Sequence, residues 1–275
     1  MKIIIDGNWC LHRAYYVFRR FEYDGVKTGT MYGLLRDVFL LAHRFQTNDI
    51  HVTWDSKSFR KELNENYKSN RVKEEGDSPY TNWDLVSECL KYAGVNQYIQ
   101  EGYEGDDIIF SLSQQENDED VIIFTSDQDM YQCLKQNVKV LRDHKKEPFS
   151  LEDFEKELGF PFSIDNYILY KSVVGDGSDN IKGIHRFPKK DIRAYLSGDN
   201  MSSRGQKMFD ENQDLLEQNK KIFELHNIEC TPIKGKINPQ GIEKMKSFYG
   251  LKQIWKHAGA VQMGIGEPKT IKVKL

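Results

Sequence analysis

Residues 96–110, NQYIQEGYEGDDIIF, combine a predicted strand, a turn and a predicted helix that begins with acidic residues. The run NQYIQ is typical of a strand, and the residues from Asp106 to Leu112 follow a helical pattern. Glu104, Asp106 and Asp107 therefore open the helix together. Like charges this close destabilise the folded state unless protonation, a basic neighbour or a bound cation offsets them. Which of these applies depends on where the other carboxylates of the chain fall.

Four more short runs predict buried strands, and helical patterns separate them. The strand runs are rich in Val and Ile and lack polar alternation, as in strands covered on both faces. They are KIIID from Lys2, HVTW from His51, VIIFT from Val121 and VKVL from Val138. Helices are predicted for residues 31–45 and 83–92. Alternating strands and helices predict a parallel sheet in an α/β domain.

The second half of the chain is predicted to be mainly helical. Ser150 is a suitable N-cap for a helix over SLEDFEKEL, and further helical patterns start at Ile164, at Lys189 and at Gln206, the last running to His226. We therefore expect two parts, residues 1–174 and residues 175–275. The polar stretch VKEEGDSP, residues 72–79, predicts a mobile loop. The tail EPKTIKVKL is typical either of an edge strand or of a disordered basic tail.

The composition is that of an ordinary globular protein. The chain has 275 residues, 29% charged and 39% hydrophobic, and a formal net charge of −3, so the overall charge gives no sign of nucleic-acid binding. Its four cysteines are far apart in the sequence, which favours reduced thiols in the cytoplasm. No apolar run approaches membrane-spanning length, so we expect no membrane association.

Carboxylates follow several of the predicted strands. Asp6 ends the first run, Asp55 directly follows HVTW, Asp127 follows VIIFT after one serine, and Asp129 lies two residues beyond Asp127. In open α/β sheets ligands bind beyond the carboxyl ends of the strands, so these acids and the group at residues 104–107 are expected to share one rim. Asp176 and Asp179 lie in a Gly-rich turn, VVGDGSDNIKG.

An acid cluster of this size cannot stay ionised at neutral pH without cations. Oxygen ligands without His or Cys suit Mg²⁺ or Mn²⁺. Two such ions roughly 3.5–4 Å apart stabilise the attacking and leaving oxygens of a phosphodiester displacement. Each acid alone has another explanation, because Asp6, Glu104, Asp106 or Asp179 could cap a turn or a helix. Independent caps have no reason to share one sheet edge, so the acids together favour metal binding.

Five segments of the chain resemble, in order and with similar spacing, the motifs of the 5′-nuclease or flap endonuclease superfamily. The likeness is greatest to stand-alone phage 5′→3′ exonucleases and to the 5′-nuclease domain of bacterial DNA polymerase I. The segments are IIIDGNWCLHRA, WDSKSFRKELNENYKSNR, GYEGDD, TSDQDMYQCL and GDGSDNIKGI. Gly105 stands where the family has alanine, Gln128 where it usually has lysine, and Lys182 where it has proline.

The resemblance implies a PIN-like parallel-sheet nuclease core, with a helical arch segment at residues 56–83. A divergent helix–hairpin–helix (H3TH) is implied within residues 175–275. All nine acidic positions of the family match this chain, and two metal ions are implied. The first would draw on Asp55, Glu104, Asp106 and Asp127, the second on Asp127, Asp129, Asp176 and Asp179. Asp6 and Asp107 complete the predicted metal-binding set.

Basic residues of the arch segment are the second implied constellation. Lys68 and Arg71 match positions that meet the scissile phosphate, and with Asp106 and Asp127 they form the predicted catalytic set. Arg60 and Tyr67 also match the family and are expected to contact DNA. A cation there can neutralise charge that develops on the phosphoryl group. By spacing alone the segment would be a solvated helix face, because Glu62, Glu65, Glu74 and Glu75 are interleaved.

The predicted hairpin departs from the family. Arg186 and Pro188 stand where the family has glycines whose amides contact phosphates. In the family, nearby carbonyls also hold a potassium ion, and these departures disfavour both the amide contacts and the ion in this chain. Side-chain charge can substitute, so Lys182, Lys189, Lys190 and Arg193 are the predicted duplex contacts.

The function implied is a metal-dependent 5′ nuclease acting on flaps, nicks and RNA-primed 5′ ends of DNA. We expect a monomer working in replication, in the host cytoplasm if phage-encoded, with single-strand-binding or other replication proteins as partners. Two alternatives stay open: a related nuclease with RNase H-like preference for RNA, and a catalytically weak DNA-binding module. The complete acid set argues against the second.

Overall fold

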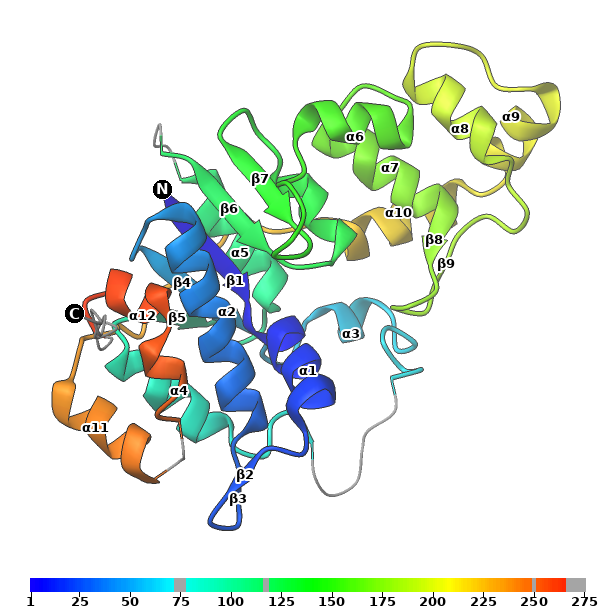
Figure 1. Cartoon of the computed structure of the whole chain (residues 1–275). Coiled ribbons are helices and arrows are strands. Elements are labelled where there is room, and N and C mark those ends of the chain that lie inside the picture. Colours follow the sequence, from blue (N-terminus) through cyan, green and yellow to red (C-terminus); the bar gives the residue numbers. More distant parts are fainter. Residues whose placement is uncertain (72–77, 116–118, 249–250, 266–275) are drawn as a thin grey trace.

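The computed structural model describes residues 1–71, 78–115, 119–248 and 251–265. Its centre is a five-stranded sheet with the strand order β5-β4-β1-β6-β7, in which all neighbouring strands are parallel (Figure 1). The strands are β1 Lys2–Asp6, β4 Ile50–Trp54, β5 Asn96–Ile99, β6 Val121–Phe124 and β7 Val138–Leu141. The α/β class, the parallel sheet and all five predicted strands are confirmed.

Helices cover both faces of the sheet. Successive side chains of β1 point to opposite faces of the sheet and pack in different hydrophobic clusters. Ile3 and Ile5 belong to the cluster with residues of α2 and α4, whereas Ile4 belongs to the cluster with residues of α5. Burial on both sides explains why the strand runs lack polar alternation. The helices of this half are α1 Gly7–Phe18, α2 Gly29–Phe45, α3 Arg60–Leu63, α4 Trp83–Tyr92, α5 Gly105–Gln114 and the 3₁₀ helix η1 Gln128–Cys133. A short hairpin, β2 Glu22–Tyr23 and β3 Val26–Lys27, joins α1 to α2.

Helix α1, which the sequence pattern did not predict, begins without a loop at the end of β1. Asp6 ends the strand and also caps the helix, because its Oδ1 accepts a hydrogen bond of 2.9 Å from the Trp9 amide. Gly7 makes the close approach to β4 feasible: a Cβ there would lie 2.6 Å from the Thr53 carbonyl oxygen and from the Trp54 ring. The junction therefore fixes Asp6 at the rim of the sheet.

The second half is mainly helical, as predicted. Its elements are α6 Leu151–Leu158, α7 Ile164–Val174, β8 Gly175–Asp176, β9 Ile181–Lys182, α8 Lys189–Leu196, α9 Ser203–Asp210 and α10 Gln213–Phe223. The prediction of one helix over residues 206–226 is wrong, since α9 and α10 are separate and the second ends at Phe223. Asn212 lies at the break, and its side-chain Nδ2 donates to the Met208 carbonyl. Such side-chain competition with the backbone disfavours Asn within a helix.

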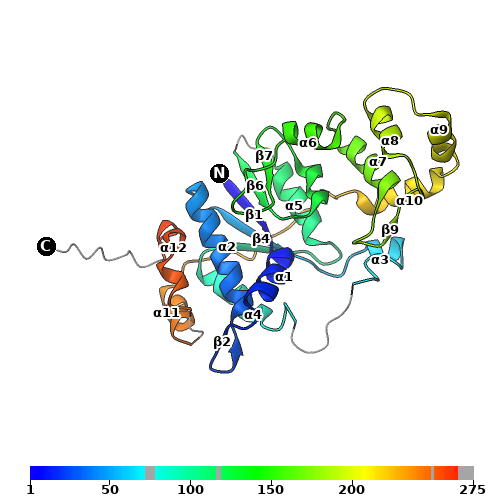
Figure 2. The same cartoon turned by 45° about the vertical axis from the view of Figure 1, so that its right-hand side comes forward.

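The C-terminal elements return to the first half of the chain. They are α11 Pro239–Phe248, the 3₁₀ helix η2 Ile254–Lys256 and α12 Ala258–Gln262. Helix α12 packs on α2, and α11 on α4, far from α8 and α9, which lie at the opposite end of the molecule in both views (Figures 1 and 2). Ile233 exchanges backbone hydrogen bonds with Gln97 on β5. The division at residues 174 and 175 stays a prediction.

Residues 72–77 of the predicted loop and the tail at 267–275 lie outside the described residues. Within the described ranges, no helix has the length and apolar character needed to cross a bilayer. The four cysteines are free, and three of them, Cys10, Cys89 and Cys133, are buried.

Candidate active site

Five of the predicted acids line one cleft of about 600 Å³ at the carboxyl edge of the sheet. They come from different segments: Asp6 from β1, Asp55 after β4, Asp106 from α5, Asp127 after β6 and Asp176 from β8. Because the strands are parallel, their carboxyl ends meet at one edge and deliver these side chains to the same place.

Backbone and side-chain donors orient the carboxylates of β1 and β4. The second oxygen of Asp6, Oδ2, accepts a hydrogen bond of 2.9 Å from Thr125 Oγ1. Asp55 accepts from Asn8 Nδ2 at 2.9 Å and from the Gly105 amide at 2.7 Å. The starts of α1 and α5 therefore hold Asp55 in place. Asn8 was not singled out in the sequence, although it lies two residues after Asp6 in the opening motif.

Burial and mutual repulsion act on the acids of the cleft. Burial, together with the nearby Asp55 and Asp127 carboxylates, raises the pKa of Asp6 to about 7. The pKa of Asp106 is also raised well above its usual range, first by burial and then by the Asp127 and Asp6 carboxylates. Negative charge in the cleft is thus incompletely compensated by the protein at neutral pH.

A second group of acids surrounds Lys171, a residue that the sequence did not single out. Lys171 Nζ lies 2.8 Å from Asp129 Oδ1 and 2.6 Å from Asp176 Oδ2. Burial opposes ionisation of Asp176, but the hydrogen bonds from Lys171 and Ser178 outweigh it and lower the pKa of Asp176 to about 2. Burial raises the pKa of Asp129 to about 7 despite the same lysine.

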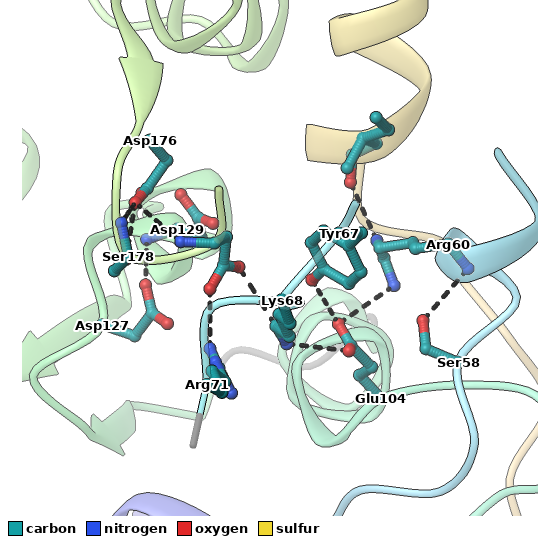
Figure 3. Close-up of polar contacts among 12 residues, drawn as sticks. Ser58, Arg60, Tyr67, Lys68, Arg71, Glu104, Asp127, Asp129, Asp176 and Ser178 are labelled. Atoms are coloured by element: carbon teal, nitrogen blue, oxygen red, sulfur yellow. Dashed lines mark hydrogen bonds and ion pairs between the residues drawn. The ribbon is translucent and has the colours of Figure 1, made fainter. Parts of the chain in front are cut away.

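The arch segment contributes cations to the rim of the cleft (Figure 3). Lys68 Nζ lies 2.7 Å from Glu104 Oε1, and the Tyr67 hydroxyl donates to Glu104 Oε2 at 2.9 Å. Arg71 Nη2 lies 2.6 Å from Asp179 Oδ1. Lys68 and Arg71 line the cleft, whereas Glu104 and Asp179, which these side chains hold, do not belong to its lining. Across from them gather Asp127, Asp129, Asp176 and Ser178.

Three predicted site residues are buried and paired within the protein. Asp107 is 0% exposed and forms a bidentate pair with Arg60, at 2.7 and 2.8 Å, so its carboxylate points into the core instead of toward a metal ion. Arg60 is 2% exposed and also donates to the carbonyls of Ile222 and Glu224, so it is not available to DNA. Tyr67 is 4% exposed and positions Glu104. The family pattern marks all three, but their role here is to fasten the arch segment to α5 and α10.

Arg60→Ala is expected to lower the free energy of unfolding by about 3–5 kcal/mol, because it leaves a buried carboxylate without its partner. Urea denaturation measures the change. Arg20→Ala, at an exposed arginine, is the control and should change stability by less than about 0.5 kcal/mol. Normal stability combined with weakened DNA binding in Arg60→Ala would restore the prediction of a DNA contact.

Further residues line the cleft without having been predicted. They are Asn8, Trp9, His12, Tyr80, Ser126, Gln128, Lys171 and Ser178. Tyr80 lies far from Asn8 in the sequence, yet its hydroxyl accepts a hydrogen bond of 2.9 Å from Asn8 Nδ2. No local pattern could have revealed this contact, since only the fold brings the two residues together.

The predicted hairpin residues lie away from the cleft, near α8 and α9. Lys182, Lys189 and Lys190 are exposed and Arg193 is half-buried. Arg186 has a φ of 54°, the left-handed conformation that glycine adopts most easily. Pro188 is the N-cap residue of α8 and has no amide to donate. The side chains of Arg186 and Pro188 thus replace features that the family obtains from glycine.

The donor set fits a hard divalent cation. The cleft offers carboxylate oxygens, which suit Mg²⁺ or Mn²⁺. Asp129 Oδ1 is buried, with the Lys171 ammonium group 2.8 Å away. As they stand in the described part of the chain, no three His, Cys, Asp or Glu side chains form a ready-made metal group. Lys68, Arg71 and Lys171 occupy several of the carboxylates instead.

Carboxylates at the carboxyl edge of a parallel sheet, with lysine and arginine at the rim, are typical of metal-dependent nucleases. The family described as "5′-3′ exonuclease, N-terminal resolvase-like domain" matches residues 1–159. The chain belongs to this 5′-3′ exonuclease family, which confirms the predicted superfamily and the predicted class of enzyme, a nuclease.

The chain is also similar to known 5′-3′ exonucleases in sequence and to solved nucleases in fold. A 5′-3′ exonuclease of Mycoplasmopsis pulmonis is 30% identical over 199 residues, which cover 71% of this chain and 65% of that protein. The solved structure of the T5 5′-exonuclease with bound divalent zinc ions has a TM-score of 0.65 at 15% identity, covering 97% of this chain and 99% of the other. The bacteriophage T5 D15 flap endonuclease, in complex with DNA and metal ions, has a TM-score of 0.61 at 16% identity, with 96% and 98% covered. At these identities the solved structures establish the fold.

Proposed function

We propose that the protein is a divalent-metal-dependent 5′ nuclease that hydrolyses phosphodiesters near free 5′ ends of DNA, at flaps, nicks and RNA-primed ends. The observation that carries this proposal is the convergence of Asp6, Asp55, Asp106, Asp127 and Asp176 on one cleft whose rim bears Lys68 and Arg71. The likeness to nucleases solved with metal ions and with DNA supports it.

Two groups of carboxylates would hold the metal ions. The first comprises Asp55, Glu104, Asp106 and Asp127, with Asp6 in the same cleft, and the second comprises Asp127, Asp129, Asp176 and Asp179. When bound, Mg²⁺ or Mn²⁺ lowers the pKa of water and stabilises negative charge on phosphate oxygens. The raised pKa values of Asp6 and Asp106 favour this assignment, because a divalent cation would supply the compensating charge that the protein lacks.

Lys68 and Arg71 would bind the phosphate that is cut. In the structure each is paired with a carboxylate, Lys68 with Glu104 and Arg71 with Asp179. A phosphate entering the cleft offers both cations a second anionic partner. Fixed cations in such a site act most strongly where charge develops in the transition state.

DNA would be anchored beyond the cleft by the exposed lysines of β9 and α8. Contacts to phosphates position the duplex without reading its sequence, so we expect cleavage that depends on structure and not on sequence. We extend the proposal to primer removal in DNA replication by a monomeric cytoplasmic enzyme, with single-strand-binding proteins as partners.

Replacing Lys189 and Lys190 together by alanine is expected to weaken binding to duplex-bearing flaps and to flatten the salt dependence. Each lost phosphate contact lowers the slope of log K against log salt by about 0.9, hence by up to about 1.8 for the pair. Binding assays in Ca²⁺ at several salt concentrations measure the affinity and its salt dependence. Lys156→Ala, which removes a lysine on α6, is the control. If side-chain charge replaces the family's hairpin contacts, sodium and potassium should act alike. A marked potassium preference with the double variant unaffected would contradict this account.

The proposed substrate class is tested with matched oligonucleotides. Purified protein is incubated in Mg²⁺ with a 5′-labelled flap, a nicked duplex and a single strand, each made with deoxyribose and with ribose at the cleaved position. We expect cleavage close to the junction of the DNA flap and at the nick. Faster cleavage of the ribose substrates would favour an RNA-directed nuclease. Binding to flaps without cleavage would indicate a DNA-binding module.

A further inference from the structure

We propose that Lys171 is an exchangeable internal cation: its ammonium group occupies the second carboxylate group in the metal-free protein and leaves it when a divalent ion binds. The inference rests on the proposed function, because it assumes that these carboxylates bind a metal ion. It assigns a role to a residue that no sequence motif marked.

The position of Lys171 Nζ is central to the group. It lies 2.6 Å from Asp176 Oδ2 and 2.8 Å from Asp129 Oδ1, and the side chain is 11% exposed. The first of these acids comes from the β8–β9 turn and the second from η1, so the lysine bridges two segments that would otherwise bring like charges together. Phe223 lies under the ammonium group, with Nζ 5.0 Å from the ring centre.

The partners of the two acids differ in how completely they are satisfied. Asp176 Oδ1 accepts hydrogen bonds from the Ser178 amide at 2.8 Å and from Ser178 Oγ at 2.5 Å, which leaves Oδ2 for the lysine. Asp129 Oδ1 is buried and has the Lys171 ammonium group 2.8 Å away. The lysine charge therefore stands where a divalent ion would otherwise compensate the two acids.

Space for movement is present beside the group. Lys171 and Asp176 both line the main cleft, so the flexible lysine side chain can swing toward the place where a phosphate would enter. The described carboxylates do not form a ready-made metal group while Lys171 lies among them. A divalent ion and the ammonium group would therefore compete for the same oxygens. The displaced ammonium group would add positive charge to the cleft when metal-bound enzyme meets DNA.

Calcium titration without DNA tests the competition. Isothermal titration calorimetry follows Ca²⁺ binding to the wild-type protein and to the variants Lys171→Met and Lys171→Arg. Lys171→Met removes the competing charge and is expected to increase the affinity of one Ca²⁺ site about tenfold. The affinity rises because the ammonium group and the Ca²⁺ ion repel each other at short range. Lys171→Arg keeps the charge and should bind as weakly as the wild type. Lys156→Met is the control for net charge, because Lys156 is 74% exposed on α6.

Unchanged or weaker Ca²⁺ binding in Lys171→Met would overturn the proposal, since it would show that the lysine only organises the site. If that variant does not fold, crystals of the wild-type protein grown with EDTA and with Mn²⁺ decide the question. We expect Nζ at ion-pair distance from Asp129 and Asp176 in EDTA, and an ion between these acids with Nζ displaced in Mn²⁺. An unmoved lysine with the metal bound elsewhere would overturn the proposal. Neither negative result bears on whether the enzyme needs Mg²⁺ for cleavage, which a separate assay measures.

Discussion

Replacing Asp127 by asparagine is expected to lower the single-turnover rate of flap cleavage by about 10³-fold or more, which corresponds to about 4 kcal/mol of transition-state stabilisation. Asp127 follows β6, lines the cleft and belongs to both proposed carboxylate groups. The substitution removes one negative charge from the place where the metal ions would lie. It is nearly isosteric, so the loss is expected to arise from chemistry and not from packing.

The local fold should survive this substitution. Asp127 Oδ1 accepts a hydrogen bond of 2.8 Å from the Asp129 amide at the start of η1, and an asparagine carbonyl oxygen can accept the same bond. Binding of a flap in Ca²⁺ is therefore expected to change little. Asp165→Asn, at an exposed acid in the first turn of α7, is the control and should leave the rate unchanged. Equal losses of binding and of rate in Asp127→Asn would indicate a structural role.

Lys68→Met is expected to lower the same single-turnover rate by about 10²- to 10³-fold, a loss typical of removing one fixed group that stabilises developing charge. Lys68 has a φ of 54°, a conformation that non-glycine residues adopt only when their surroundings enforce it. Its amide donates to the Asp179 carbonyl at 2.9 Å. This bond ties the arch segment to the β8–β9 turn and places the Lys68 side chain at the cleft.

Methionine keeps the length of the lysine side chain and removes its charge. Lys61→Met, in α3 of the same arch segment and exposed, is the matched control and is expected to cut at the normal rate. If Lys68 only neutralised Glu104, Lys68→Met would lose stability and keep a nearly normal rate at saturating enzyme. Measuring urea denaturation beside the rate separates the two roles. Arg71, whose side chain is 55% exposed, should show a smaller effect.

The sequence predicted the positions of the cleft acids because parallel strands end at one edge. Asp6, Asp55 and Asp127 follow three strands whose runs of Val and Ile are unambiguous, and the structure brings them together. The order of strands and helices along the chain is enough to predict which residues lie at this edge of the sheet. This part of the site therefore follows from local patterns.

The partners of the other acidic and basic residues could be found only from tertiary contacts. Asp106 and Asp107 are neighbours in sequence, but successive residues of a helix point about 100° apart, so one carboxylate faces the cleft and the other meets Arg60. Lysines are mostly exposed in proteins, so the sequence alone would place Lys171 of α7 on a solvent-exposed face. Its side chain points inward only because α7 packs beside η1 and the β8–β9 segment. The return of α11 and α12 to the first half of the chain depends on contacts between residues more than 150 positions apart, such as Phe39 and Trp255.

The most direct test of the central claim, that these carboxylates bind divalent ions which the enzyme needs to cut DNA, is the metal dependence of cleavage. A 5′-labelled flap is incubated with the wild-type protein in Mg²⁺, then in EDTA, and then with Mg²⁺ restored, with Ca²⁺ in a parallel reaction. The account predicts cleavage near the flap junction in Mg²⁺, none in EDTA, recovery on return of Mg²⁺, and binding with little cleavage in Ca²⁺, whose looser coordination does not impose the geometry of Mg²⁺. Undiminished cleavage in EDTA would contradict it.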